Sequence, residues 1–209
     1  MKAILMSIQP KHLVNILNGK KTLEIRKSIP KGFVGWVYIY CTKGKPYITE
    51  TCNNYNNLYM FETFNIPHFG DIDLNGKVVA RFWFDEYIAY KYYEDDNSYF
   101  AKRPQDFGYH ADEVLKRLCL SRDEFKTYGK GKDLYAWRIK KLEIFDRPKK
   151  LNEFCRYLYQ GYTGIGVLET YHKLEDLEED IRQNLISLHM DKYKITKAPQ
   201  TYCYIEVIE

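Results

Sequence analysis

The residues best suited to bind a ligand or to catalyse a reaction lie close together near the start of the chain. Lys21, Glu24 and Arg26 follow Gly19 in the pattern G-x-K-x-x-E-x-R. Arg26 carries a planar fork of donors that suits a phosphate or the edge of a base, and Lys21 supplies a flexible positive charge. Glu24 can neutralise Arg26, accept a proton from a base amino group, or act as a general base. The segment therefore predicts a polar site for an anionic or nucleoside-like ligand.

Strand spacing would bring these side chains to one surface. In a strand, alternation sends Leu23 and Ile25 into the core. Thr22, Glu24 and Arg26 then line the opposite face. A second interpretation is that the charged residues of the pattern form an ion-pair network that braces a helix against this strand. The two interpretations are compatible.

A strand and a helix are expected to position this site. Residues 2–8 are apolar enough for a buried strand, and Pro10 suits the first turn of a helix. Apolar residues then recur at helical spacing up to Asn18-Gly19, where glycine takes the left-handed cap without strain. The sequence predicts a strand, a helix and a second strand that ends at Arg26.

The rest of the chain predicts further elements. Strands are expected at 34–42, 77–87, 134–145 and 201–208, and helices at 111–117, 121–129, 151–159 and 173–189. In the strand at 134–145 the alternation of apolar residues shifts by one position at Lys140-Lys141, which is typical of a β-bulge. Ser121 and Glu124 predict a capping box at the start of the helix that follows them. Residues 43–76 are expected to form a loop-like insertion or flap, and residues 91–109 to be irregular.

These elements indicate an α+β fold in which a small β-barrel is decorated by peripheral helices. A length of 209 residues suits one domain. We expect a single domain over 1–209, with insertions at 43–76 and 155–195.

The composition of the chain argues against a membrane-spanning protein and against a zinc-binding protein. No apolar run reaches the roughly 18 residues that span a bilayer, so no membrane segment is expected. The five cysteines are scattered and form no C-x-x-C pair, which favours a reducing, cytoplasmic setting and argues against a zinc site. The five histidines show no metal or catalytic spacing, so neither a metal nor a cofactor is expected. His12, on the first helix, could approach the site, but it is expected to be a solvated helix residue. Residues 1–50 carry nine Lys or Arg against two Glu, a mild indication of an anionic partner.

The segment from Ser7 to Arg26 resembles the ASCH domain (activating signal cointegrator homology), a branch of the PUA-like superfamily. The resemblance rests on Ser7-Ile8-Gln9-Pro10, then Gly19, Lys21, Glu24 and Arg26. Segments 35–40, 77–80, 134–139 and 199–206 extend it, and the last two are similar to prophage-type members. The resemblance implies a PUA-like barrel.

Some ASCH proteins are amidohydrolases that release acetate from N4-acetylcytidine with a lysine, a nucleophilic threonine and a glutamate. The resemblance places that lysine at Lys21, whereas Glu24 stands at the threonine position, where a carboxylate cannot form an ordinary acyl-enzyme. Thr22 lies roughly 6–7 Å away along a strand, too far to substitute. Glu113 is the nearest candidate for the glutamate. Other relatives are ribonucleases, and Glu24 as base with Lys21 and Arg26 as charge stabilisers would suit metal-independent cleavage.

The first hypothesis is therefore an RNA-binding or modified-nucleoside-binding protein, and the alternative is a hydrolase of an acylated nucleoside or of RNA. Lys21, Glu24 and, more remotely, Glu113 are the catalytic candidates. The binding candidates are Ser7, Lys20, Lys21, Thr22, Glu24, Arg26, Trp137 and Tyr202, the last two as stacking surfaces or as core residues. DNA is a possible ligand. A third interpretation, a host-interaction factor with a protein partner, is implied by the prophage-type resemblance alone. The apolar stripe expected in 173–189 suits packing on its own core, with a homodimer as the alternative.

Overall fold

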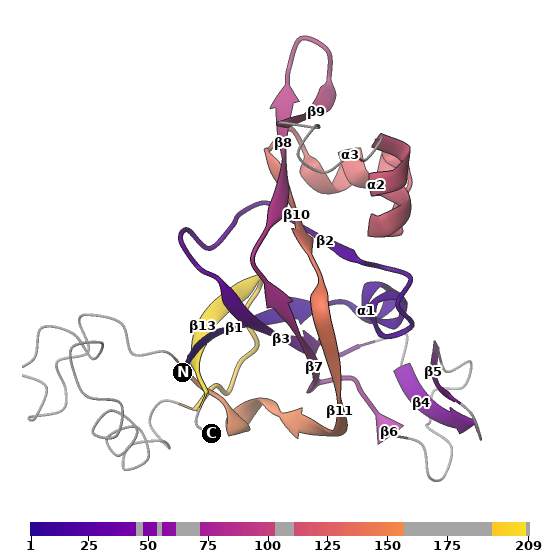
Figure 1. Cartoon of the computed structure of the whole chain (residues 1–209), viewed down its shortest axis with the longest axis vertical. Coiled ribbons are helices and arrows are strands. Elements are labelled where there is room, and N and C mark those ends of the chain that lie inside the picture. The colour runs from indigo at the N-terminus through magenta and orange to yellow at the C-terminus, as the bar shows by residue number, and fades with distance from the viewer. Residues whose placement is uncertain (45–47, 54–55, 62–71, 103–110, 157–193, 208–209) are drawn as a thin grey trace, which may run out of the picture.

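The structure is a computed structural model that describes residues 1–44, 48–53, 56–61, 72–102, 111–156 and 194–207. Within these residues the fold is mixed α+β, with three α-helices and three sheets (Figure 1). The larger sheet, sheet A, has the order β11 (Lys140–Lys150), β7 (Lys77–Phe84), β3 (Gly35–Cys41), β1 (Lys2–Ile8), β13 (Tyr202–Glu206) and β12 (Cys155–Arg156). Sheet B has the order β2 (Leu23–Arg26), β10 (Leu134–Arg138), β8 (Tyr87–Tyr93) and β9 (Ser98–Lys102).

The two sheets are linked by strand pairs that continue from one into the other. In sheet A, β7 pairs with β11. In sheet B, β8 pairs with β10. Because β8 follows β7 in the chain and β10 precedes β11, the same two chain segments pair in both sheets. The predicted bulge is confirmed: between the pairs Lys140–Trp83 and Glu143–Arg81, β11 carries one more residue than β7, and Lys141 has a φ of 45°. Among the described strands no pairing closes either sheet into a barrel, so the barrel stays a prediction.

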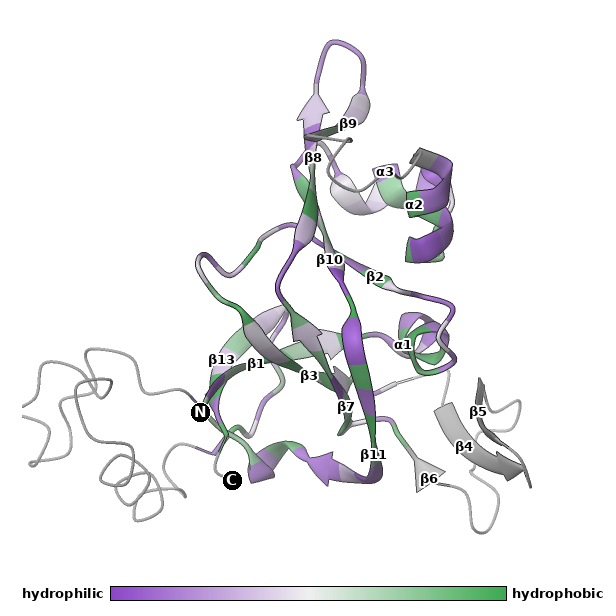
Figure 2. Ribbon diagram, viewed as in Figure 1, coloured by the Kyte–Doolittle hydropathy of each residue, from purple (hydrophilic) through white to green (hydrophobic). Residues whose placement is uncertain are grey.

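Three helices cover the sheets. α1 (Pro10–Leu17) buries its apolar face against β1, β3 and β7, with Pro10 at its start and Gly19 at a φ of 70° just beyond its end. α2 (Ala111–Leu118) and α3 (Arg122–Gly129) pack Val114, Leu118 and Phe125 against the strands of sheet B. In Figure 2 the hydrophobic residues of α2 alternate with hydrophilic ones, as one buried face requires.

The capping box predicted for α3 is confirmed. The backbone N–H of Glu124 donates to the Ser121 hydroxyl over 3.1 Å, and the backbone N–H of Ser121 donates to the Glu124 carboxylate over 2.8 Å. Both bonds satisfy donors that the first turn of a helix otherwise leaves open.

Within the described residues, two predictions of irregular structure and one helix prediction were wrong, whereas the predicted insertion at 43–76 stays a prediction. Residues 43–76 contain β4 (Ile48–Asn53), β5 (Asn56–Phe61) and β6 (Ile72–Asp73), which form the third sheet, because their β-branched and aromatic residues favour strands despite the many asparagines. Residues 91–109 contain most of the β8–β9 hairpin. Of the helix expected at 151–159, residues 151–156 form a 3₁₀ turn, Leu151–Glu153, and β12 instead, and residues 157–159 lie outside the described residues. The helix predicted at 173–189 lies outside the described residues.

Candidate nucleic-acid interface

A cavity of about 750 Å³ lies where segments far apart in the chain meet. Its walls come from the end of β1 and the first turn of α1, from β2 with its flanking Lys21 and Lys27, from α3, and from residues 200–201 before β13. A volume of this size lies within the range of small-molecule sites, roughly 300–1,000 Å³. The cavity therefore has room for a nucleotide-sized ligand.

The predicted charged residues converge at this cavity. Lys21, Glu24 and Arg26 are 2%, 5% and 8% exposed, and all three line it. Glu24 Oε1 lies 3.1 Å from Arg26 Nη2, and Glu24 Oε2 lies 3.4 Å from Lys21 Nζ. One carboxylate is thus held between two cations, and the group as a whole carries one excess positive charge.

Each cation also has a backbone partner. Lys21 Nζ donates to the carbonyl of Leu118 over 2.7 Å, at the carboxyl end of α2, where a positive charge is favoured. Arg26 Nη2 donates to the carbonyl of Ser7 over 2.7 Å. The network therefore braces β2 against α2 and β1, which is the second interpretation considered from the sequence, and it does so while facing the cavity.

Ser7 connects this network to the end of the chain. Its backbone N–H donates to the carbonyl of Thr201 over 3.0 Å, and its hydroxyl donates to the carbonyl of Pro199 over 2.7 Å. Ser7 thereby fixes residues 199–201, of which Gln200 and Thr201 line the cavity.

The alternation of β2 explains how the charged side chains reach the cavity. Leu23 and Ile25 pack with Ile88, Leu134 and other apolar residues of sheet B, as the sequence predicts. Glu24 and Arg26 then point to the opposite face, where α1, α3 and the end of β1 enclose them. The alternation of side chains along β2 therefore allows this four-residue strand to form one wall of the cavity.

Two polar atoms of this group lack hydrogen-bond partners. Arg26 Nε and Glu24 Oε2 are buried and make no hydrogen bond, although the ion pair with Lys21 reaches Glu24 Oε2. Buried donors and acceptors are normally satisfied, since leaving one unmet costs about 1–3 kcal/mol. Neither atom has surface that a ligand in the cavity could reach, so their unmet capacity is a cost of burying the network.

His12 and Tyr128 face the same network. Burial lowers the pKa of His12, and the positive charge of Lys21 lowers it further, so the imidazole is neutral near pH 7. Burial raises the pKa of Tyr128, an effect that the positive charge of Arg26 opposes. Lys27 lies over the Tyr128 ring, with its ammonium 5.3 Å from the ring centre. The cavity therefore offers a neutral imidazole and a phenol beside the cations.

Several predicted site residues lie elsewhere. Trp137 is completely buried, with its ring centre 4.4 Å from that of Phe84, so it is a core residue and offers no stacking surface. Tyr202 packs against Trp137, with the ring centres 5.4 Å apart. Glu113 is exposed on α2 and pairs with Arg117, which removes it from the network.

Lys20 and Thr22 also lie outside the cavity wall, although they flank Lys21. Lys20 is exposed, whereas the Thr22 hydroxyl is buried and has no hydrogen-bond partner. Thr22 falls on the strand face that alternation gives it, but the cavity opens further along β2, towards Arg26 and Lys27.

Sequence reasoning missed the wall formed by α3 and the chain before β13. Thr127 and Tyr128 lie one helix away from the motif, and Gln200 and Thr201 lie near the opposite end of the chain. The capping box fixed where α3 begins, and helical spacing could have grouped Asp123, Glu124 and Thr127. Nothing in a single sequence shows that this face of α3 meets β2.

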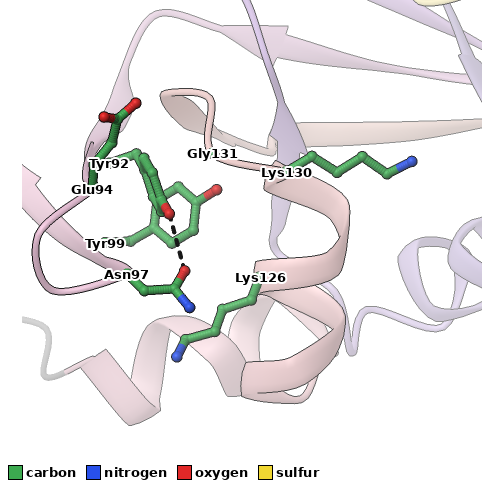
Figure 3. Close-up of a pocket in the computed structure, with 7 residues that line it drawn as sticks. All are labelled: Tyr92, Glu94, Asn97, Tyr99, Lys126, Lys130 and Gly131. Carbon is green, nitrogen blue, oxygen red and sulfur yellow. Dashed lines mark hydrogen bonds between the residues drawn. The ribbon is translucent and has the colours of Figure 1, made fainter.

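A second cavity, of about 610 Å³, lies between the β8–β9 turn and the end of α3 (Figure 3). Tyr92 and Tyr99 stand in its wall, and the Tyr92 hydroxyl is bonded to Asn97 over 3.0 Å. In Figure 3 the side chain of Lys130 points away from the two rings, so it does not converge on them with Lys126. The charged residues of this second cavity are all exposed, which makes the first cavity the stronger candidate.

The part of the chain that the structure describes contains neither a group of metal ligands nor a membrane-spanning helix. Its His, Cys, Asp and Glu side chains form no group of three or more arranged to hold a metal ion. None of its helices combines the length and the apolar character needed to cross a bilayer.

Comparison with solved structures returns ASCH proteins. A crystal structure of ASCH from Zymomonas mobilis is 15% identical, covers 89% of this chain and 94% of its own, and has a TM-score of 0.42. Two single-residue variants of that protein have the same identity to this chain. One variant has a TM-score of 0.42 and covers 90% of this chain and 99% of its own. The other has a TM-score of 0.43 and covers 89% of this chain and 95% of its own. No protein-family model and no curated protein matches the chain. The structures carry the family name that the segment from Ser7 to Arg26 suggests, and a likeness of this extent assigns neither an activity nor a ligand.

Proposed function

We propose that this protein binds RNA or a modified nucleoside in the cavity between α1, β2 and α3. The observation that carries the proposal is the buried Lys21–Glu24–Arg26 network, which lines a cavity of about 750 Å³. Its excess positive charge suits a polyanion, whereas its carboxylate suits a ligand that also carries donors. RNA and nucleotides combine both features.

Exposed cations extend the positive charge outward from this network. Lys11 and Lys27 are exposed and line the cavity. Asp123 and Glu124 lie on the α3 side, so the positive charge is concentrated on the α1 and β2 side. We place the phosphates of the ligand along the exposed Lys11 and Lys27; Lys11 also interacts electrostatically with Glu124 of α3.

The test is the salt dependence of RNA binding. Lys11→Ala with Lys27→Ala removes two exposed cations without disturbing the buried network. Single-stranded RNA should bind at least tenfold more weakly, and the slope of log K against log salt should fall by roughly 1.4 for two lost phosphate contacts. Lys31→Ala with Lys149→Ala, which removes two exposed lysines outside the cavity, is the matched control. Equal slopes in both double variants would place RNA binding, if any, elsewhere.

A hydrolase that acts on RNA or on an acylated nucleoside is the second candidate. The specific observation in its favour is the neutral His12 imidazole beside Lys21, a pair that can move a proton and stabilise a developing negative charge. Glu24 at the threonine position of the amidohydrolases argues against an acyl-enzyme route. Incubation with N4-acetylcytidine and, separately, with single-stranded RNA, followed by mass spectrometry beside His12→Asn, tests this candidate. Product that disappears in the variant supports catalysis, and unchanged product excludes His12.

A further inference from the structure

A group of aromatic and cationic side chains lies on sheet A, apart from the cavity. Trp36 of β3 stands directly opposite Trp83 of β7, and their ring centres are 5.4 Å apart. The guanidinium of Arg81 lies 4.1 Å from the centre of the Trp36 ring. The ammonium of Lys141, from β11, lies 5.8 Å from the centre of the Trp83 ring. We call these four residues the tryptophan face.

The tryptophan face lies on the side of sheet A opposite α1. Val37 and Phe82, the chain neighbours of the two tryptophans, pack with α1 in the core. Because side chains alternate along a strand, Trp36, Arg81 and Trp83 point the other way. None of the four residues of the face lines the cavity. A ligand bound here is therefore distinct from one bound in the cavity.

The side chains of the tryptophan face can be reached from solvent. Lys141 is exposed, both tryptophans are partly exposed, and the Arg81 side chain is 28% exposed. Each ring thus presents part of its surface beside a cation. Such a surface suits a planar ligand that also carries negative charge.

The charges around the face leave one cation uncompensated. Three acidic residues, in β11 and between β7 and β8, are already paired with cations: Glu143 with Arg81, Asp85 with Lys140, and Glu86 with Lys140 and Arg138. Within the described residues Lys141 makes no ion pair, so its charge is available to an anion beside Trp83.

The β-bulge explains how Lys141 reaches this ring. β11 carries its extra residue beside Trp83, and Lys141 adopts a φ of 45°. A bulge takes one residue out of the ladder of hydrogen bonds and re-aims a side chain. The bulge therefore brings an unpaired cation over an aromatic ring.

We infer that the tryptophan face is a second binding surface, and that its ligand is single-stranded nucleic acid. A base stacks on the exposed part of Trp83, its phosphate binds Lys141, and the planar guanidinium of Arg81 stacks on the neighbouring base. Aromatic rings interspersed with cations bind single strands in this way without reading their sequence. The inference goes beyond the proposed function, because it uses no residue of the cavity.

The test follows tryptophan fluorescence, since Trp36 and Trp83 are two of the three tryptophans and Trp137 is completely buried. A single-stranded oligoadenylate of about ten nucleotides should quench the emission, whereas inorganic polyphosphate, which has the charge but no bases, should not. In Lys11→Ala with Lys27→Ala the affinity measured by quenching should stay within about twofold, because these lysines are remote from the face.

Variants of the face are made in this double-variant background, so that the cavity contributes little to binding. Lys141→Asn removes the charge and keeps a residue that tolerates a positive φ. It should lower the slope of log K against log salt by roughly 0.7, for one lost phosphate contact. Trp83→Leu should weaken binding of a labelled oligoadenylate by roughly fivefold or more. Phe100→Leu, at an exposed aromatic residue of β9, is the matched control and should leave binding unchanged.

The outcomes separate the inference from the proposed function. Quenching that polyphosphate reproduces, or that depends on Lys11 and Lys27 but not on Lys141, overturns the inference and leaves the proposed function intact. No quenching by oligoadenylate also overturns it. Quenching that depends on Lys141 supports the inference even if the cavity binds no RNA. The comparison of oligoadenylate with polyphosphate on the unmodified protein decides the matter where Trp83→Leu does not fold.

Discussion

At the scale of single residues, the stability of the site depends on Glu24. Its carboxylate is buried between the ammonium of Lys21 and the guanidinium of Arg26. Removal of one partner from a buried ion pair is strongly destabilising, because the remaining charge is left without compensation.

Glu24→Ala should therefore lower the free energy of unfolding by about 3 kcal/mol, since Lys21 and Arg26 would be left facing each other. Urea denaturation monitored by tryptophan fluorescence gives this value. Glu113→Ala is the control, because Glu113 makes an exposed pair with Arg117 and should cost no more than about 0.5 kcal/mol. A loss for Glu24→Ala as small as that of the control would show that the network contributes little to stability.

His12 gives the cavity a pH dependence. Its pKa lies below the ordinary value of 6.5 in the folded protein, so the unfolded chain takes up a proton more readily as the pH falls below 6.5. The stability that this histidine contributes is present above about pH 6.5 and is lost as the pH falls through the folded pKa. Between pH 7.5 and 5.5 the free energy of unfolding should fall less steeply in His12→Gln than in the unmodified protein. Parallel curves from chemical denaturation at each pH would rule out this role.

The residues of the motif were predictable and their surroundings were not. Alternation along β2 was enough to place Leu23 and Ile25 in the core and Glu24 and Arg26 on the other face. Trp137 was assigned two roles from the sequence, and burial against Phe84 leaves it only the role in the core. An aromatic residue in a strand has the same local pattern on either face, so only the tertiary packing distinguishes the two.

At the scale of elements, α3 depends on close packing against the β8–β9 hairpin. Gly129 ends α3, and a Cβ atom at this position would lie 1.9 Å from the Tyr99 hydroxyl and 2.6 Å from its ring. Because both contacts are shorter than any real Cβ contact, either the Tyr99 side chain or the helix must move to accommodate a larger residue.

Gly129→Ala should cost about 1–3 kcal/mol, the usual range for overpacking. Tyr99→Phe in the same chain should recover only part of the loss, because the ring carbon remains too close. Thermal denaturation of both single variants and of the double variant measures this coupling. Simple additivity of the two substitutions would contradict the proposed clash.

Elements with a local signal were found from the sequence, and elements that depend on partners were missed. The bulge at Lys141 and the capping box at Ser121 are both encoded by a few neighbouring residues, and both are present. The β8–β9 hairpin was missed because its turn, residues 94–97, has no Asn-Gly or Asp-Gly pair; Asn97 instead adopts a φ of 44°. The polar segments 48–53 and 56–61 form strands because they pair with each other.

At the scale of the whole molecule, the cavity exists because the two ends of the described chain meet. β1 lies between β3 and β13 in sheet A, parallel to β3 and antiparallel to β13. The cavity accordingly combines Thr42 with side chains drawn from the segments 7–12, 21–27, 120–128 and 200–201. Pairings of this sequence separation leave no local pattern, which is why the sequence predicted the first half of the site and not the second.

Ser7 holds this long-range closure together, because its hydroxyl donates to the carbonyl of Pro199, 192 residues away. Ser7→Ala removes this bond but keeps the backbone bonds to Thr201 and Arg26, so it should cost about 1 kcal/mol locally. Hydrogen exchange in a peptide that covers residues 199–203 should then become about fivefold faster, while exchange in β3 and β7 stays unchanged. RNA affinity should fall by a similar factor, since Gln200 and Thr201 line the cavity. Ser28→Ala, at an exposed position outside the cavity wall, is the control. If exchange at 199–203 is the same in both variants, the closure depends on the backbone bonds alone and Ser7 acts only through its position in β1.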